Sequence, residues 1–130
     1  MGILFKSTRI GNMDLRNRFA RSATGDRCAN RNGHVTDKQI QLFKELADGA
    51  VGLILTGVTC IHASGQISPP QSSIASDEHI EGFKRLTAAV HDQGAKIAVQ
   101  LHHGGKEGVT FLKTNTTEHH VYPAISAWRR

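Results

Sequence analysis

The chain has 130 residues, and its 16 Lys and Arg against 11 Asp and Glu give a formal net charge of +5 with neutral histidines. This length suits one domain with a sizeable core, and no apolar run approaches the roughly 18 residues of a membrane helix. The basic residues are scattered, without the tract of Lys and Arg that marks a nucleic-acid-binding segment, so a mild positive excess equally suits an anionic ligand such as phosphate.

The first part of the chain predicts a hairpin, a short strand and a loop. Two β-capable runs within residues 8–16 flank Gly11 and Asn12, a dipeptide typical of tight turns. Residues 18–23 predict a short strand. Residues 24–34 are polar and rich in Gly and Asn, and they predict a loop.

A helix is predicted to begin near Thr36, because Thr36 and Gln39 have the spacing of a capping box. Gly49 is expected to end this helix. Its apolar face has helical spacing and consists of Ile40, Phe43, Leu46 and Ala47. Residues 51–58 follow as a continuous apolar run, which is typical of a strand buried on both faces of a parallel sheet.

A second helix and a third buried strand are predicted next. Ser76 is the expected N-cap, and acidic residues follow it in the first turn, where the helix dipole favours them. Gly94 is expected to end the helix, whose apolar stripe consists of Ile80, Phe83, Leu86 and Val90. Residues 96–101 predict the strand, and residues 106–130 are polar without clear periodicity.

Strands that alternate with helices predict an α/β fold, built from right-handed βαβ units around a parallel sheet. Ligands bind at the carboxyl ends of such strands, so the candidate site consists of the three segments Ser22–Gly25, Thr56–Thr59 and Gln100–Gly105. The small residues of the first two segments equally fit ordinary tight turns. Gln100 can pair with a heterocycle or with backbone groups inside the protein, and the sequence leaves both possibilities open.

The histidines and cysteines predict no metal site. His102 and His103 are adjacent, and neighbouring residues of a strand point to opposite faces, so they are not expected to share one ion. The glycines that follow them resemble a phosphate loop only superficially. Cys28 and Cys60 lack zinc or disulfide spacing. Cys60 is expected to be a buried side chain rather than a nucleophile, and a reduced, cytoplasmic protein is predicted.

Three motifs in register resemble the start of the old yellow enzyme family, the FMN-dependent NAD(P)H:flavin oxidoreductases. They are "LRNRF" (15–19), "SDEHIEGF" (76–83) and "QLHHGG" (100–105), within a resemblance that runs from residue 4 to about residue 105. It implies the N-terminal portion of a (β/α)8 TIM barrel, with a hairpin that closes the bottom and about three barrel strands. Residues 1–130 would then form a single incomplete domain.

The resemblance also implies an FMN site across the carboxyl ends of the strands. Gln100 would bond the pyrimidine part of the flavin, Arg27 matches a position that touches substrate in some members, and His103 matches a family histidine. The implied cofactor-binding residues are Ser22, Ala23, Thr24, Gly25, Val58 and Gln100. Well-known members carry Pro, then Met or Leu, then Thr or Cys at residues 23–25, so Gly25 lacks the side chain that tunes their flavin.

The implied activity is that of an ene-reductase or 2,4-dienoyl-CoA reductase, with NADH or NADPH as reductant and an activated alkene or enone as substrate. A complete barrel takes about 250 residues, and the family's later catalytic and phosphate-binding residues have no match here. Catalytic residues are therefore not assigned, and the 130 residues alone are expected to be inactive. Two alternatives stay open: a truncated module that oligomerises or docks with a missing barrel half, and a small doubly wound domain that binds an anionic nucleotide.

Overall fold

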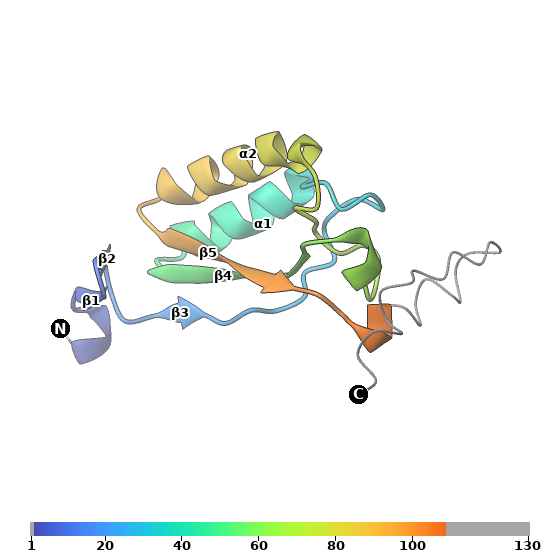
Figure 1. Ribbon diagram of the computed structural model, residues 1–130. Coiled ribbons are helices and arrows are strands. Elements are labelled where there is room, and N and C mark those ends of the chain that lie inside the picture. The colour runs from blue at the N-terminus through green and yellow to red at the C-terminus, as the bar shows by residue number, and fades with distance from the viewer. Residues whose placement is uncertain (1, 109–130) are drawn as a thin grey trace, which may run out of the picture.

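A computed structural model describes residues 2–108 of the chain (Figure 1). A 3-10 turn, η1 (Ile3–Phe5), precedes a hairpin of β1 (Thr8–Ile10) and β2 (Met13–Leu15). Strands and helices then alternate in the order β3 (Ala20–Arg21), α1 (Asp37–Asp48), β4 (Leu53–Cys60), α2 (Ile80–His91) and β5 (Lys96–His102). Two further 3-10 turns, η2 (Ala63–Gly65) and η3 (Asp77–His79), lie between β4 and α2. The predicted α/β order is confirmed.

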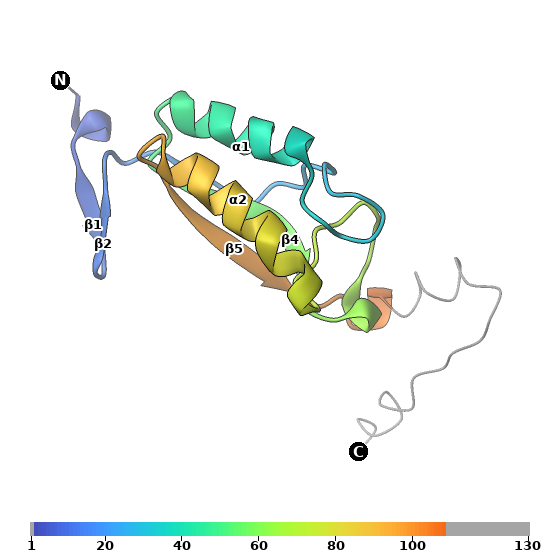
Figure 2. The same cartoon turned by 90° about the horizontal axis from the view of Figure 1, so that it is seen from above.

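The hairpin is the one that the sequence predicts. Its antiparallel register pairs Thr8 with Leu15 and Ile10 with Met13. Gly11 adopts a φ of +56° in the connecting turn, a backbone conformation that glycine reaches without steric cost. Figures 1 and 2 both place this hairpin beyond the amino-terminal end of the larger sheet.

Helix α1 begins and ends where the sequence predicts. The Thr36 hydroxyl accepts a hydrogen bond from the Gln39 N–H at 3.2 Å, which is one half of a capping box. The other half is missing because the Gln39 side chain turns inward instead. At the C-terminus Gly49 has a φ of −65°, and it is Ala50 that takes the left-handed conformation, with a φ of +68°. The prediction that Gly49 ends the helix is confirmed, since Gly49 is the C-cap residue, while the left-handed residue is the next one.

Helix α2 is preceded by the 3-10 turn η3, with Ser76 as the cap residue of that turn. The Ser76 hydroxyl lies 3.1 Å from Nδ1 of His79 and caps no backbone N–H. Leu86 and Val90 of the predicted stripe are fully buried, whereas Ile80 is 49% exposed. Gly94 follows the helix with a φ of +74°, as its predicted role as terminator requires.

The larger sheet is parallel, with the strand order β3-β4-β5. The predicted strand at residues 18–23 shrinks to the two residues of β3, which pair with Leu53 and Ile54 of β4. The prediction that residues 96–101 form a buried strand is wrong for the described residues. Most of β5 is exposed, because β5 is the edge strand of this sheet and no described element packs beyond it.

Both long helices cover the same face of the sheet (Figure 2). The core lies between these layers and consists of Phe43, Ala47, Ile54, Leu86, Val90 and Ala95. Side chains alternate along a strand, so the residues paired in register share a face. Leu55 with Ala98, and Val58 with Gln100, thus lie on the face opposite Ile54 and its partner Ile97.

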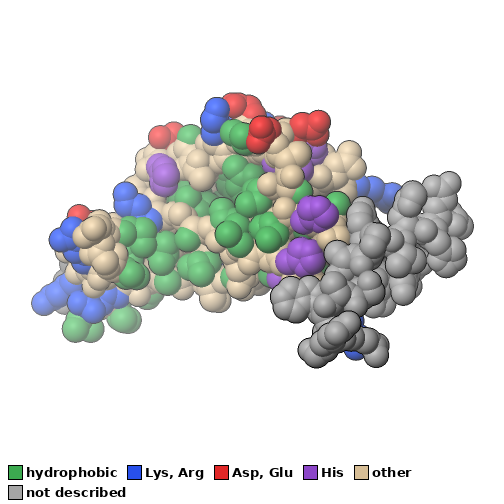
Figure 3. Space-filling model, viewed as in Figure 1, with side chains coloured by type: hydrophobic (Ala, Val, Ile, Leu, Met, Phe, Trp, Pro, Cys, Tyr) green, Lys and Arg blue, Asp and Glu red, His purple; other side chains and the backbone are tan. Residues whose placement is uncertain are grey.

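That second face carries no other described element, and apolar side chains also gather around β5 in the view of Figure 3. On this face Ala98 and Gln100 of β5 are exposed. Val99 (36% exposed) and Leu101 (63% exposed) lie on the same face as Ile97, where the helices leave the end of this edge strand uncovered. The expectation that the inner faces of these strands meet water is confirmed for β5 and holds in part for β4, where Leu53 is buried.

Candidate functional site

The three predicted segments meet at the carboxyl end of the sheet, opposite the hairpin (Figure 1). A Cβ built on Gly57 would lie 2.8 Å from the Thr24 carbonyl oxygen and 3.3 Å from the Cα of Gly25, so the first segment packs directly on the second. Val58 is paired in register with Gln100, which joins the second segment to the third. The topology therefore brings together all six residues predicted to hold the cofactor.

The loop after β3 presents backbone donors. Within residues 2–108, the amide N–H groups of Ala23, Thr24 and Gly25 have no intramolecular acceptor. The Thr24 hydroxyl donates back to the Ser22 carbonyl at 3.2 Å. Its proton is therefore used locally, while the neighbouring amides have no acceptor among the described residues. Unpaired backbone N–H groups of this kind can donate hydrogen bonds to a polar ligand.

A bulge in β4 fixes the position of Gln100. The register of β4 with β5 shifts between Leu55 and Val58, and the Thr56 hydroxyl oxygen accepts the Gln100 N–H at 3.1 Å. The same hydroxyl donates to the Gly57 carbonyl at 2.9 Å. A threonine side chain thus replaces the ladder bond that the bulge interrupts. The position of Thr56 after an apolar run was the only signal in the sequence for this role of its hydroxyl.

Gln100 itself is exposed, which corrects the prediction of a buried glutamine. Its side-chain amide makes no hydrogen bond to the described part of the chain. Of the two roles that the sequence left open, pairing with internal backbone groups is therefore not the one seen in residues 2–108. The amide offers one donor group and one acceptor to a ligand on the bare face.

A cleft of about 160 Å³ opens beside these segments. Its walls come from the loop after β3, the bulge of β4 and the long β4–α2 loop. The lining residues include Gly25, Asp26, Arg27, Gly57, Val58 and Gln71. The cleft therefore adjoins two of the three predicted segments.

Behind the cleft, a buried polar cluster holds the loops in place. Gln39 is 2% exposed, and its Nε2 donates to Asp26 Oδ2 at 3.1 Å and to the Ser72 hydroxyl at 2.9 Å. Asp26 Oδ1 also accepts the Cys28 N–H at 2.8 Å. This cluster ties α1 to both loops that wall the cleft. Sequence reasoning assigned Gln39 only a capping role and missed the cluster.

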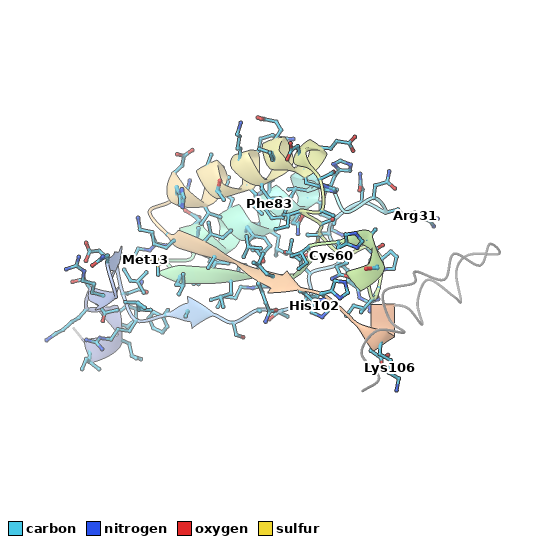
Figure 4. The ribbon with its side chains drawn as sticks, viewed as in Figure 1. Met13, Arg31, Cys60, Phe83, His102 and Lys106 are labelled. Atoms are coloured by element: carbon cyan, nitrogen blue, oxygen red, sulfur yellow. The ribbon has the colours of Figure 1, made fainter. Side chains whose placement is uncertain are left out.

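The adjacent residues His102 and His103 make different contacts. His102 pairs in register with Cys60 (Figure 4), and its Nδ1 lies 3.5 Å from the Gln71 amide nitrogen. His103 Nδ1 accepts the Gly105 N–H at 3.0 Å, so the neutral ring carries its proton on Nε2. That Nε2 donates to the Ser64 hydroxyl at 3.1 Å.

Ser64 continues this chain to a third histidine. Its hydroxyl donates to Nδ1 of His62 at 2.8 Å, and its backbone N–H approaches the same nitrogen at 3.2 Å. The β4–α2 loop is thereby fastened to the segment that follows β5. Among the described residues, no group of three His, Cys, Asp or Glu side chains is placed to hold a metal ion. Cys28 and Cys60 are both buried and unbridged.

The opposite end of the sheet explains the "LRNRF" motif. Arg16 donates to the carbonyl oxygens of Gln93 at 2.6 Å, Val51 at 3.0 Å, and Ala47. These acceptors lie just beyond or at the ends of the two helices, where carbonyls lack intrahelical partners. Asn17 accepts the Phe19 N–H at 3.0 Å and donates to the Ala50 carbonyl at 2.6 Å. This motif closes one end of the fold and takes no part in the cleft.

Comparison with known proteins supports the resemblance. The sequence matches the NADH:flavin oxidoreductase / NADH oxidase family over residues 3–124. It is 37% identical over 105 residues to an NADH oxidase of Thermoanaerobacter brockii, a match that covers 80% of this chain and 16% of that protein. It is 36% identical over 105 residues to an NADPH dehydrogenase of Bacillus subtilis, covering 80% of this chain and 31% of that protein.

Comparison with solved structures supports the same family. An old yellow enzyme homologue from Zymomonas mobilis is 30% identical, with a TM-score of 0.70, over 78% of this chain and 28% of that one. A 2-naphthoyl-CoA reductase in complex with 2-naphthoyl-CoA is 27% identical, with a TM-score of 0.74, over 82% of this chain and 17% of that one. The strands and helices described above correspond to a portion of the (β/α)8 barrel of such enzymes. The chain spans less than a third of the length of these relatives. No described helix is long and apolar enough to cross a membrane.

Proposed function

The chain belongs to the NADH:flavin oxidoreductase / NADH oxidase family, and on that premise we propose that it forms one wall of an FMN-dependent, ene-reductase-type active site. The observation that carries the proposal is the juxtaposition at the carboxyl end of the sheet. There, unpaired amides of residues 23–25, the Val58 side chain and the unpaired amide of Gln100 lie on one edge.

The donor set fits the pyrimidine part of a flavin, whose edge alternates hydrogen-bond donors and acceptors. A primary amide can pair with both kinds of group at once, and Gln100 has no competing partner among the described residues. Nothing lies within 4 Å of the position that a Cβ on Gly25 would take, so a flat ring can approach the backbone closely there. Ser22, Ala23, Thr24, Gly25, Val58 and Gln100 are the residues that would hold the cofactor.

In this proposal, the residues of this chain bind and orient the cofactor. The Thr56 hydroxyl fixes the backbone of Gln100 through the bond at 3.1 Å, so the strand position that carries the side chain is set before any ligand arrives. The absence of a side chain at Gly57 lets the loop after β3 pack against β4, with the Thr24 carbonyl at this position. Pre-organisation of this kind lowers the ordering cost of binding. The phosphate-binding and proton-donating residues of the site lie outside the segments described here, and no catalytic residue is assigned.

The proposed overall reaction consumes one NADH or NADPH and one proton. When bound, the flavin supplies the carrier through which the hydride of the reduced nicotinamide reaches the alkene. The carbon–carbon double bond of an activated alkene or enone gains that hydride and the proton and becomes a single bond, and NAD+ or NADP+ leaves. A catalytically silent module that associates through the exposed edge strand β5 is the second candidate, favoured by the exposed Val99 and Leu101.

Purification of the protein from its complete reading frame tests the proposal. We expect a yellow protein that releases FMN on denaturation, together with NADH or NADPH oxidation that depends on an added enone. A colourless protein that binds no FMN on titration, and that self-associates in sedimentation, would favour the silent module instead.

A further inference from the structure

We propose that Gln39 is a positioning residue of the flavin site, which keeps the negative charge of Asp26 out of the cleft and holds the two walls of the cleft together. The inference rests on the proposed reductase function and assigns to that site a residue of α1 that does not line the cleft. Its basis is the buried contact of the Gln39 amide with Asp26 and Ser72, one from each loop that walls the cleft.

The buried amide nitrogen of Gln39 joins two loops. The side chain is 2% exposed, although glutamine seldom lies inside a protein unless its polar groups are paired. One N–H of Nε2 is directed at the Asp26 carboxylate, at 3.1 Å from Oδ2 and 3.3 Å from Oδ1, and the other donates to the Ser72 hydroxyl at 2.9 Å. Both protons of the amide are therefore used between the two loops.

The acceptor half of the same amide is unused. Oε1 of Gln39 has no hydrogen-bond partner among residues 2–108, and a buried carbonyl without a partner destabilises a fold. An ionised carboxylate only accepts hydrogen bonds, so the reversed amide would bring Oε1 against the Asp26 oxygens, which repel it. Gln39 is thus placed as a donor to Asp26 and Ser72, even though its own carbonyl is left unpaired.

The Asp26 carboxylate borders the proposed flavin edge. Asp26 follows Gly25 directly and lines the cleft together with Gly57. Its Oδ1 accepts the Cys28 N–H at 2.8 Å, in addition to the bonds from Gln39. Neither donor lines the cleft, so both hold the carboxylate toward the interior.

The position of this charge matters for a flavin. Reduction adds negative charge to the pyrimidine part of the ring, and protein charges near that part set how readily the ring is reduced. A carboxylate that faced the ring across the cleft would oppose the added charge. With Asp26 held by Gln39, the loop offers the ring the amides of residues 23–25 without the charge of the next residue.

The second bond of Gln39 reaches the other wall of the cleft. Ser72 is 8% exposed and lines the cleft from the β4–α2 loop, and its carbonyl accepts the Cys60 N–H at the end of β4 at 2.8 Å. One amide in the first turn of α1 thus connects both walls. The Thr36 hydroxyl also donates to the Cys28 carbonyl at 2.5 Å, so α1 and the loop after β3 stay joined when Gln39 is replaced.

The variant Gln39→Met, in the protein made from its complete reading frame, tests the inference. Methionine keeps a similar volume and removes both donors, so the Asp26 carboxylate is free to turn toward the cleft. We expect an FMN Kd about 10-fold higher and a more negative midpoint potential of the bound flavin. Hydrogen exchange of the amides of residues 24–28 in the flavin-free protein should be faster than in the wild type.

Substitution of the two partners separates positioning from a loss of stability. In an Asp26→Asn background no charge is left to face the flavin, so adding Gln39→Met should no longer lower the potential. Ser72→Ala removes only the bond to the other wall and leaves Asp26 held. We therefore expect Ser72→Ala to keep the wild-type potential and to raise the FMN Kd by about 3-fold.

Two controls are matched to Gln39→Met. Gln41→Met makes the same replacement on the exposed face of α1, where the Gln41 amide donates to Glu45. Val90→Ala removes buried methyl groups from the core beneath α2 and lowers global stability. Both controls should keep the wild-type Kd and potential.

An unchanged FMN Kd and potential in Gln39→Met would overturn the role of Gln39 while the reductase function stands, and unchanged exchange of residues 24–28 would show that the loop is held without it. A potential that falls equally in the Asp26→Asn background would overturn the claim that Gln39 acts through that charge. A protein that binds no FMN would instead refute the proposed function and, with it, the role assigned to Gln39.

Discussion

The two ends of the parallel sheet use polar groups in opposite ways. At the amino-terminal end, Arg16 and Asn17 donate to carbonyls at both helix termini, and these two side chains are used inside the fold. At the carboxyl end, Gln100 and Arg27 have no partner in the described part of the chain, and three consecutive amides lack acceptors.

This difference separates structural motifs from binding motifs. Folding leaves few backbone and side-chain groups unpaired, because each lost hydrogen bond is costly. Groups that are paired within the chain stabilise it, and groups that converge on one edge without partners are available to bind. "LRNRF" therefore serves stability, and we propose that "QLHHGG" serves the ligand site through its first residue.

The largest effect on stability is expected at the closed end. Arg16→Ala removes the donors to three carbonyls and should lower the free energy of unfolding by about 2–3 kcal/mol. Arg18→Ala, the matched control, removes an exposed arginine and should change it by less than about 0.5 kcal/mol. Urea denaturation of both variants measures the difference. Equal stabilities would mean that the closed end is not held by Arg16.

A second test concerns the contact that joins the loop after β3 to β4. The Cβ of Gly57→Ala would lie 2.8 Å from the Thr24 carbonyl oxygen, so the loop must shift. We expect a loss of about 1–2 kcal/mol together with weaker FMN binding. Gly25→Ala meets open space within 4 Å and should leave stability within about 0.5 kcal/mol. Thermal melts of the two variants compare them, and identical melting would refute the contact.

The bulge is tested by Thr56→Val, which keeps the shape and removes the hydroxyl. The Gln100 N–H then loses its acceptor, and a loss of about 1 kcal/mol is expected. Thr87→Val on α2 is the control, since the Thr87 hydroxyl only returns to the helix's own carbonyls. Denaturation midpoints distinguish them. An unchanged midpoint in Thr56→Val would show that the hydroxyl of Thr56 is not needed to hold β5.

The histidine contacts at the open end should have the smallest effect. Ser64→Ala breaks the link between His62 and His103, both of which are exposed. We expect less than about 1 kcal/mol in global stability, with faster hydrogen exchange of the Gly104 and Gly105 amides as the loops separate. Unchanged exchange would indicate that backbone contacts alone join the two loops.

The sequence predicted correctly those elements whose formation depends on neighbouring residues alone. The hairpin at Gly11, the helix start at Thr36 and the apolar face with Phe43 follow from turn chemistry, capping and periodicity, and all three are confirmed. The prediction from sequence was wrong where contacts between residues far apart in the sequence determine the structure. Gln39 serves Asp26 and Ser72 rather than its own cap, and no local pattern contains that information.

The burial of β5 was mispredicted for a related reason. An apolar pattern along a strand predicts that the strand is buried. Within residues 2–108, β5 is an edge strand and Leu101 is exposed. The meeting of the three strand ends was predicted correctly, because parallel topology alone places them together. The bulge at Thr56 and the left-handed Arg27 were not foreseen, since both depend on tertiary packing.

The most direct test of the central claim is the affinity for FMN of Gln100→Ala in the protein made from its complete reading frame. The exposed side chain makes no internal bond in the described residues, and its backbone N–H keeps the Thr56 acceptor. The account therefore predicts unchanged stability and an FMN Kd about 10-fold higher. Gln93→Ala, at the closed end, should bind FMN normally. An unchanged Kd in Gln100→Ala would contradict the claim that the unpaired groups of the open end form the flavin site.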